Sequence, residues 1–453
     1  MKKSTLALAV TVAALAQQAG AAGFLEDSKA SVSSRTLYFD NDYREGTTHN
    51  SRETATGLKF DYLSGFTQGT VGFGLDLQGL VGVHLDGGRG AHSGALNGGV
   101  LPTDSDGSAV NEWSRLGANG KVRFSKTELK VGNALAPNLP ILVSNDGRLL
   151  PQAFQGGILT SKDLDTVTFT AGQLNKSIGR ASSNWTDLSV AGASQTSDQF
   201  RFAGADWKVT KDLTLQYYYA NLEDFYKQHF LGLVHVYPIS DNQSFKTDLR
   251  YFNSSSDGKN SDAATGYRFN NNGYAKNTGE VDNSTWSAMF TYSLGGHALM
   301  VGHQQVGDNG GMVFLGQGSV TKDGTTRSSL EGNGGSSFYL FTDSMINGFN
   351  RAGENTTFGQ YSYDFAKVGV PGLKAAIAYL NADDIRGNTA ATRNNSYSEW
   401  ETDMRVDYVI QSGPMKGFGT TLRHGTYRAD GDLNNSTNTD QTRLIFNYTY
   451  NFM

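Results

Sequence analysis

The sequence contains no cysteine and only seven prolines among its 453 residues. Without cysteine, the chain cannot form a disulfide framework or a thiolate metal site. The formal net charge of −5 argues against a nucleic-acid partner, because such partners are bound by positively charged surfaces. Hydrophobic residues make up only 38% of the chain. After the N-terminal segment, no apolar run approaches the ~18 residues that a membrane-spanning helix needs.

The first residues, Met1–Ala22, have the three parts of a secretory signal. Lys2 and Lys3 form a positive end, an apolar run covers 6–15, and 19–21 read Ala-Gly-Ala, a small-residue cleavage site. The alternative is a transmembrane anchor, for which the apolar run is too short. We therefore expect residues 1–22 to be a signal peptide. Its removal takes away two positive charges and leaves a mature chain of about −7.

From Ser28 onward, apolar and polar residues alternate with a period of two. In Gly57–Tyr62, Leu58 and Phe60 share one face with Tyr62, and Lys59 and Asp61 share the other. The C-terminal segment does the same, with Leu444, Phe446, Tyr448, Tyr450 and Phe452 on one face. This period is typical of β-strands in which each face meets a different environment.

The connections between these segments alternate between short and long. We expect eight short turns, near 64–69, 124–127, 160–166, 209–212, 238–243, 293–297, 366–372 and 411–417. Nine longer connections are expected near 42–52, 85–112, 133–157, 176–196, 222–224, 255–279, 303–354, 383–396 and 429–439. Seventeen connections predict eighteen strands.

A secreted chain with an even number of strands, short turns at one end and long loops at the other is typical of an outer-membrane barrel. We expect an all-β fold: residues 23–453 form a single antiparallel transmembrane β-barrel domain, because closure pairs every backbone group in a lipid environment. A secreted β-sandwich or β-helix is the soluble alternative. No repeat of fixed length favours it.

Three of the seven prolines, Pro137, Pro140 and Pro151, lie in the stretch 132–157. Proline removes a backbone donor, so the stretch is not expected to be an interior strand. Its many Leu, Ile, Val and Phe residues do not suit a solvated loop. We therefore expect the loop 133–157 to fold into the barrel and narrow the lumen.

The longest connection, about 303–354, carries an apolar stretch from Phe338 to Phe349. We expect this stretch to fold into the mouth or lumen, because a large apolar patch is rarely left exposed. The alternative is contact with lipopolysaccharide or with a neighbouring barrel.

Strand parity places a set of basic residues toward the lumen on one contiguous arc of the wall, because the last strand pairs with the first in a closed barrel. They are Arg35, Lys59, Lys121, Arg123, Lys130, Arg405, Arg423 and Arg443. Fixed cations facing water attract anions and pass them from site to site. The alternative is that they only pair with inward acids, since Asp403 and Asp407 flank Arg405.

An enzymatic role would require a catalytic constellation. We find no G-x-S-x-G elbow and no H-E-x-x-H zinc motif. A serine-type barrel hydrolase is the enzymatic alternative, because the chain contains His, Ser and Asp residues that could form a triad. The run Asp104–Gly107 suggests calcium, but its spacing to later acids does not fit an EF-hand. A barrel with a blocked lumen and a structural role is a third hypothesis. No cofactor and no metal are expected.

Several segments resemble the OprD family of substrate-specific outer-membrane porins. The resemblance covers essentially the whole mature chain and is carried by the segments 23–46, 64–76, 121–133, 148–156, 222–232, 302–308, 370–373 and 409–417. It implies an eighteen-stranded monomeric channel with a basic ladder on one wall. It also implies a constriction made by the third and seventh extracellular loops, and small carboxylate-bearing nutrients as substrates.

On this resemblance, we expect the solute to pass a narrow point near Asn145, Asp146, Arg148, Asp343 and Ser344. Family members that take cationic amino acids are expected to carry acids along the seventh loop. Here the comparable stretch has Ser336 and Gly348, and only Asp343 is acidic. This difference favours an uncharged or anionic carboxylate.

The chain also ends in Phe452-Met453 rather than in an aromatic residue. Outer-membrane lipid and lipopolysaccharide are the expected surroundings.

Overall fold

The computed structural model of the protein describes residues 23–44, 50–87, 92, 100–104, 108–262, 264–270, 274–316, 335–431, 433 and 438–453. The predicted signal at 1–22 lies outside the described residues. Within the described part of the chain, no helix is long and apolar enough to cross a membrane.

Eighteen strands form the wall of a closed antiparallel barrel, which confirms the predicted fold. They are β1 (Lys29–Tyr43), β2 (Ser51–Leu63), β3 (Val71–Asp86), β4 (Glu112–Phe124), β5 (Thr127–Leu135), β8 (Ala153–Leu164), β9 (Val167–Ile178), β11 (Phe200–Lys208), β12 (Leu213–Leu222), β13 (Tyr226–Ser240), β14 (Gln243–Ser256), β15 (Asp282–Leu294), β16 (His297–Val306), β17 (Asn355–Asp364), β18 (Leu373–Arg386), β19 (Ser396–Val409), β20 (Gly419–Ala429) and β21 (Thr439–Asn451).

Short elements lie in the connections. The pair β6 (Asn138–Leu139) and β7 (Leu142–Val143) forms a small hairpin, and β10 (Thr186–Asp187) adds to the end of β9. Two 3₁₀ turns, η1 (Gly258–Asn260) and η2 (Phe365–Val368), complete the described elements.

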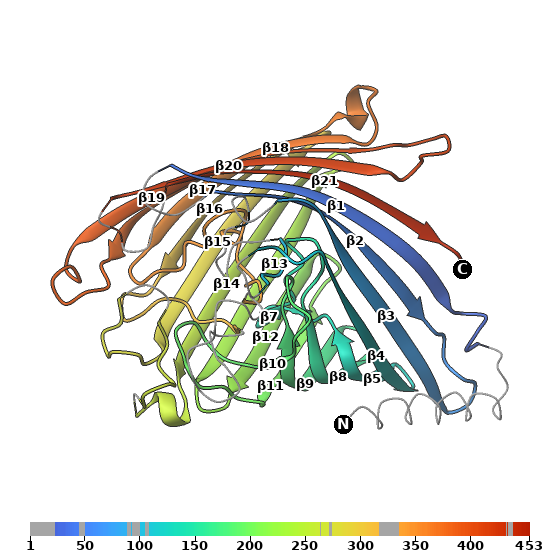
Figure 1. Cartoon of the computed structure of the whole chain (residues 1–453), viewed down its shortest axis with the longest axis horizontal. Coiled ribbons are helices and arrows are strands. Elements are labelled where there is room, and N and C mark those ends of the chain that lie inside the picture. The colour runs from blue at the N-terminus through green and yellow to red at the C-terminus, as the bar shows by residue number, and fades with distance from the viewer. Residues whose placement is uncertain are drawn as a thin grey trace.

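The barrel closes where β1 pairs with β21, in a register that runs from Ser31 opposite Asn451 to Tyr43 opposite Thr439. Figure 1 shows these two strands side by side, with the strands tilted steeply across the view. Closure leaves no free sheet edge, so the backbone can cross lipid without unpaired polar groups. Outward side chains are apolar and exposed, as for Leu116 (80%) and Leu231 (53%). This is the band that meets acyl chains.

The stretch between β5 and β8 differs in its boundaries from the sequence prediction. Asn133–Leu135 belong to β5 and Ala153–Gly157 belong to β8, so the connection covers only 136–152. Irregularities in the pairing between Gly132 and Leu135, and between Gln155 and Gly156, break the alternation there. The longest loop likewise begins at 307, because β16 runs to Val306.

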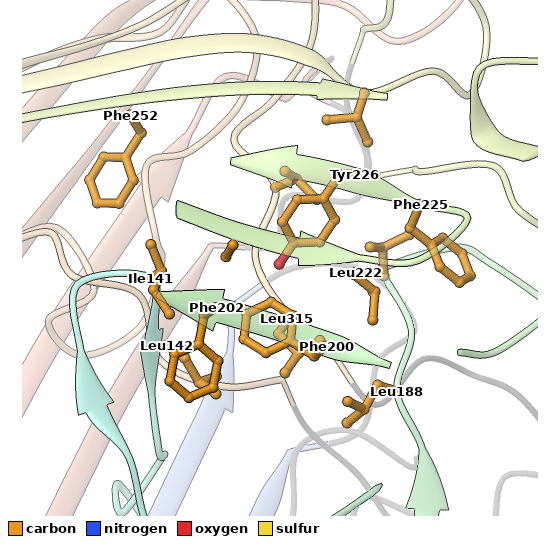
Figure 2. Packing of buried hydrophobic residues seen from close by; sticks show 14 of the residues in the cluster. Ile141, Leu142, Leu188, Phe200, Phe202, Leu222, Phe225, Tyr226, Phe252 and Leu315 are labelled. Atoms are coloured by element: carbon orange, nitrogen blue, oxygen red, sulfur yellow. The ribbon is translucent and has the colours of Figure 1, made fainter. Parts of the chain in front are cut away.

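We number the nine long connections L1 to L9. L3 (136–152), L4 (179–199) and the described parts of L7 (307–354), which are 307–316 and 335–354, pack inside the barrel. Their apolar residues join inward side chains of β11–β14 in one buried cluster, the lumenal core. Figure 2 shows part of it, with Phe200 and Phe202 of β11, Leu142 of L3, Leu188 of L4 and Leu315 of L7. The lumenal core covers one side of the interior with loops.

Glycines on the inner wall make room for the aromatic side chains of neighbouring strands. A Cβ added at Gly204 would lie 2.1 Å from the ring of Tyr218, and one added at Gly302 would lie 2.3 Å from the ring of Phe358. Both distances are too short for any side chain. An aromatic ring packed over a glycine of the next strand fixes strand register. This explains part of the glycine content of the chain.

Candidate functional site

L3 and L7 start from different parts of the barrel wall and meet inside it. The backbone N–H of Ser337 in L7 donates to the carbonyl oxygen of Val143 in L3 at 2.9 Å. The amide Nδ2 of Asn145 reaches the carbonyl oxygen of Gly335 at 3.5 Å. L3 and L7 are therefore joined to each other inside the barrel.

Carboxylates on the inner face of β19 hold the apolar part of L7. Glu401 accepts the backbone N–H groups of Ile346 at 2.9 Å and Asn347 at 2.8 Å. Asp403 accepts the hydroxyl of Ser344. Phe349, in the same stretch, is fully buried. The stretch 338–349 thus lies inside the barrel, and the alternative of contact with lipopolysaccharide or a neighbouring barrel is wrong for it.

A second set of contacts anchors the end of L7. Glu399 of β19 pairs with Arg351 and accepts hydrogen bonds from Asn347 and from the hydroxyl of Tyr427. The carboxylate of Glu354 accepts the backbone N–H of Arg351 at 2.8 Å. Burial, and then the nearby charge of Glu399, raises the pKa of Glu354 well above its usual range. Two buried carboxyls close together hold a proton readily.

Two arginines of the neighbouring strands β20 and β21 contact the same stretch of L7. Arg423 of β20 donates to the carbonyl oxygen of Ser344 at 2.9 Å, and Arg443 of β21 donates to that of Met345 at 2.6 Å. These two arginines face each other across the β20–β21 pair. Neutral carbonyl oxygens satisfy part of their hydrogen-bonding capacity, and the carboxyl groups of Asp403 and Glu401 interact electrostatically with both arginines without forming an ion pair.

Two loop arginines complete this group. The guanidinium of Arg148 in L3 lies 4.6 Å above the ring of Phe39, and that of Arg443 lies 5.7 Å from the same ring. Arg180 in L4 donates to Oδ1 of Asn145 at 3.1 Å. We refer to Arg148, Arg180, Arg423 and Arg443 as the arginine cluster. In the part of the chain that the structure describes, no carboxylate forms an ion pair with any of them.

The electrostatics of the loop members agree with this arrangement. Burial lowers the pKa of Arg148 well below its usual range, and the positive charges of Arg443, Arg180 and Arg423 lower it further. Burial also lowers the pKa of Arg180, against the raising effect of Asp343 and Asp146. The cluster is therefore a region of positive potential that an anion would stabilise.

Asp343 is the one acidic residue of the L7 stretch next to the cluster. Burial raises its pKa, against the opposing effects of Ser337, of the Phe338 N–H at 3.2 Å, and of Arg180 and Arg443. The site thus combines four arginines with Asp343, whose carboxyl group protonates more readily than usual, and with Glu401 and Asp403, which hold L7.

The structure places seven of the eight predicted basic residues in two groups, and Arg123 lies apart from both. Five of the eight are in ion pairs, of the kind that the alternative reading described: Arg35 with Asp146 at 2.7 Å, Lys59 with Asp61 at 2.8 Å, Lys121 with Asp76 at 2.6 Å, Lys130 with Asp76 at 3.3 Å, and Arg405 with Asp407 at 2.7 Å. Arg423 and Arg443 belong to the arginine cluster. Arg123 lies 4.1 Å above the ring of Phe66.

Of the residues predicted for the narrow point, Asn145, Arg148, Asp343 and Ser344 lie beside the arginine cluster, and Asp146 is held by Arg35. Arg180 was not predicted. Parity assigns only strand residues to the lumen, and Arg180 is in a loop. The sequence did contain one indication that Arg180 lacks a local ion-pair partner, because no acid lies within five residues of it.

The described residues show where several of the acidic and histidine side chains lie. They contain no group of three or more His, Asp or Glu side chains arranged to hold a metal ion. Asp104 of the predicted calcium motif is in a turn, and 105–107 lie outside the described residues. His92 contacts Glu53 and, at 2.6 Å, the hydroxyl of Thr103, but its side chain is completely buried. These contacts hold His92 and Thr103, both in the described part of L2 (87–111), against Glu53 of β2.

Comparisons with known proteins agree with this architecture. The family model described as outer membrane porin, OprD family, matches residues 22–452. Porin D of Pseudomonas aeruginosa is 32% identical over 99% of this chain and 98% of that porin. The crystal structure of P. aeruginosa OccK8 (OprE) has a TM-score of 0.82 at 44% identity, covering 95% of this chain and 100% of that one.

A third similar structure is P. aeruginosa OpdK with vanillate, with a TM-score of 0.79 at 30% identity, covering 95% of this chain and 100% of that one. These relatives are porins, which are channels rather than enzymes, and their location is the Gram-negative outer membrane. The fold, the inward loops and the match over nearly the whole chain lead to one conclusion. The chain belongs to the OprD family of outer-membrane porins.

Proposed function

We propose that this porin takes up small nutrients that carry a carboxylate, and that the arginine cluster is the site where the carboxylate binds at the narrow point. The observation that carries this proposal is the set of four neighbouring arginines without a carboxylate partner among the described residues. Arginine presents a fork of donors that matches the two oxygens of a carboxylate. A solute carboxylate would supply the missing counter-charge.

The paired basic residues have a second role in this proposal. Positions on β1 give the order of these residues from the loop end to the turn end of the barrel. Arg443 of β21 pairs with Phe39 of β1, and Arg35 lies four residues from Phe39 toward the turn end. Lys59 of β2 comes next, because it pairs with Ser33. Lys121 and Lys130 face each other closer to the turns. A carboxylate leaving the cluster would exchange with the acids that hold these groups. The steps at the more exposed pairs, such as Lys59–Asp61, would be weak, since exposed pairs contribute about 0–1 kcal/mol, and weak steps permit passage. The buried pair Lys121–Asp76 would stay closed.

The solute class follows from charge and from similarity. The four arginines lie near the acids Asp343, Glu401 and Asp403, and the last two already accept hydrogen bonds from L7. We therefore expect the site to disfavour a strongly cationic solute. Vanillate, the compound named with OpdK, is an aromatic carboxylate, and we take this class as the first substrates to test. We also propose that the channel works as a monomer, since the lumen and both loops come from one chain.

The test is uptake into proteoliposomes of two solutes that share a shape and differ in charge, benzoate and benzamide. In the wild-type porin, benzoate should enter faster. Arg148→Ala should slow benzoate at least tenfold, and benzamide less than twofold. The control is Arg201→Ala, because Arg201 lies on the outward face of β11 between the inward Phe200 and Phe202.

Equal effects of Arg148→Ala on both solutes would contradict a carboxylate site. If neither solute enters through the wild-type porin while ions also fail to pass in planar bilayers, the blocked-lumen hypothesis is favoured. Hydrolysis of esters by the purified porin would instead revive the hydrolase alternative.

A further inference from the structure

The outer face of the barrel has a groove of about 430 Å³ near the turn end of β16–β19. Its floor is Ala375 of β18. On the outward face, the cross-strand neighbours of Ala375 are Tyr363 of β17 and Val406 of β19. The cross-strand neighbours of Ile377, two residues further along β18, are Tyr361 and Met404. A methyl group among much larger side chains leaves the space that forms the groove.

One wall of the groove is a continuous set of aromatic rings. The rings of His297 and Tyr363 are 4.5 Å apart, and those of Tyr363 and Phe365 are 4.8 Å apart in an edge-to-face arrangement. Nδ1 of His297 lies 2.7 Å from the hydroxyl of Tyr361. These contacts fix the rings, so the groove is built into the wall. Rigid aromatic walls are typical of sites that hold apolar ligands.

The groove has a basic rim at its turn end. Lys367 of η2 packs against Gly296, the residue before His297, because a Cβ added at Gly296 would lie 3.2 Å from Cγ of Lys367. Asp364, the acid of this turn, interacts with Lys367, but it also pairs with Lys374 at 3.3 Å and accepts the backbone N–H of Ala366 at 3.0 Å. A basic residue therefore lies at the turn end of the groove, next to the strand that begins with His297.

We propose that this groove binds one phospholipid of the periplasmic leaflet, with an acyl chain over Ala375 and the phosphate beside Lys367 and His297. The short turns of an outer-membrane barrel face the periplasm, so the groove opens to the leaflet on that side. A phospholipid has an apolar acyl chain toward the membrane centre and an anionic phosphate at the membrane surface. The groove has the matching arrangement, with apolar walls toward the membrane centre and a cation at the surface end.

The proposal is tested by native mass spectrometry of the detergent-purified porin titrated with phosphatidylglycerol. We expect one tightly bound lipid per barrel. Ala375→Trp, which fills the floor, should weaken its binding at least tenfold, and Ala375→Leu should weaken it less. The control is Ala118→Trp, on the outward face of β4 with Leu116 and outside the groove. Unchanged conductance in planar bilayers shows that each variant is folded.

The rim is tested separately with Lys367→Gln and, as a matched control, Lys416→Gln in the turn between β19 and β20. Only the first should weaken binding, by roughly three- to tenfold. Equal binding to Ala375→Trp and Ala118→Trp would overturn the proposal. So would equal effects of the two lysine variants, or a second copy of the porin on this face in place of lipid. None of these outcomes depends on which solute the lumen passes.

Discussion

The backbone N–H of Ser337 in L7 donates to the carbonyl oxygen of Val143 in L3 at 2.9 Å, and this bond joins two loops across the interior of the barrel. Neither loop sets the width of the channel alone. L3 is packed into the lumenal core, and L7 is held by Glu401, Asp403, Arg423 and Arg443. The position of L7 therefore also depends on wall residues outside the arginine cluster, Glu401 and Asp403.

Removing one of these wall contacts should loosen L7. Glu401→Ala deletes a charged acceptor that binds two successive backbone N–H groups, Ile346 and Asn347, and hydrogen bonds to charged groups contribute about 1.5–3 kcal/mol each. We expect larger and noisier single-channel conductance and faster entry of neutral sugars. Asp165→Ala, in an exposed turn, is the control. An unchanged conductance would show that L7 does not need this anchor.

The lumenal core should govern the stability of the folded loops. Phe200 of β11 is fully buried among residues of L3, L4 and L7. Phe200→Ala should lower the free energy of unfolding by about 3–5 kcal/mol, because it leaves a large cavity. Reversible urea unfolding in lipid vesicles measures this change. Phe169→Ala, on the outward face of β9 and 47% exposed, should cost clearly less. Equal costs would contradict a packed interior.

The two groups of basic residues should respond differently to substitution. Lys121 is 6% exposed and pairs with Asp76 at 2.6 Å, so Lys121→Gln should lower the free energy of unfolding by about 3–5 kcal/mol and slow benzoate less than threefold. Arg443→Gln should slow benzoate at least tenfold. The double variant Asp76→Asn with Lys121→Gln should recover much of the lost stability. A larger effect of Lys121 than of Arg443 on uptake would invalidate this division.

The selectivity of the channel should depend on pH through Asp343. Its pKa is raised above the ordinary value of about 3.9, so Asp343 loses its charge at a higher pH than a free aspartate. As pH falls through the raised pKa, the negative charge disappears and the arginine cluster dominates. We expect the anion preference, measured as the zero-current potential in a salt gradient, to increase over that range. Asp343→Asn should remove this change, whereas Asp308→Asn should leave it intact.

The strands and their number could be predicted because lipid imposes one simple pattern. Outward residues must be apolar over a whole strand, and the segment from Leu444 to Phe452 shows this without any tertiary information. The strand ends near 133–135 and 153–157 were missed because bulges shift the alternation by one residue. Prolines in the centre of that stretch made all of it look like a loop.

The site was harder to predict than the wall. On β11–β14 both faces carry aromatic residues, as with inward Tyr218 beside outward Tyr217, so the sequence alone does not show that the interior there is filled by loops. Parity identified inward basic residues but not their partners, since Asp76 reaches Lys121 from another strand. Arg180 reaches the cluster through the path of a loop, and that path is fixed by packing at Leu188.

The most direct measurement of the proposed function is a crystal structure of the porin soaked with 4-bromobenzoate, with the bromine located by anomalous scattering. We predict that its carboxylate lies within hydrogen-bonding distance of at least two members of the arginine cluster, Arg148 and Arg443 first. A carboxylate bound only to the paired lysines near the turns, or no ordered carboxylate inside the barrel at a concentration that supports uptake, would contradict the account.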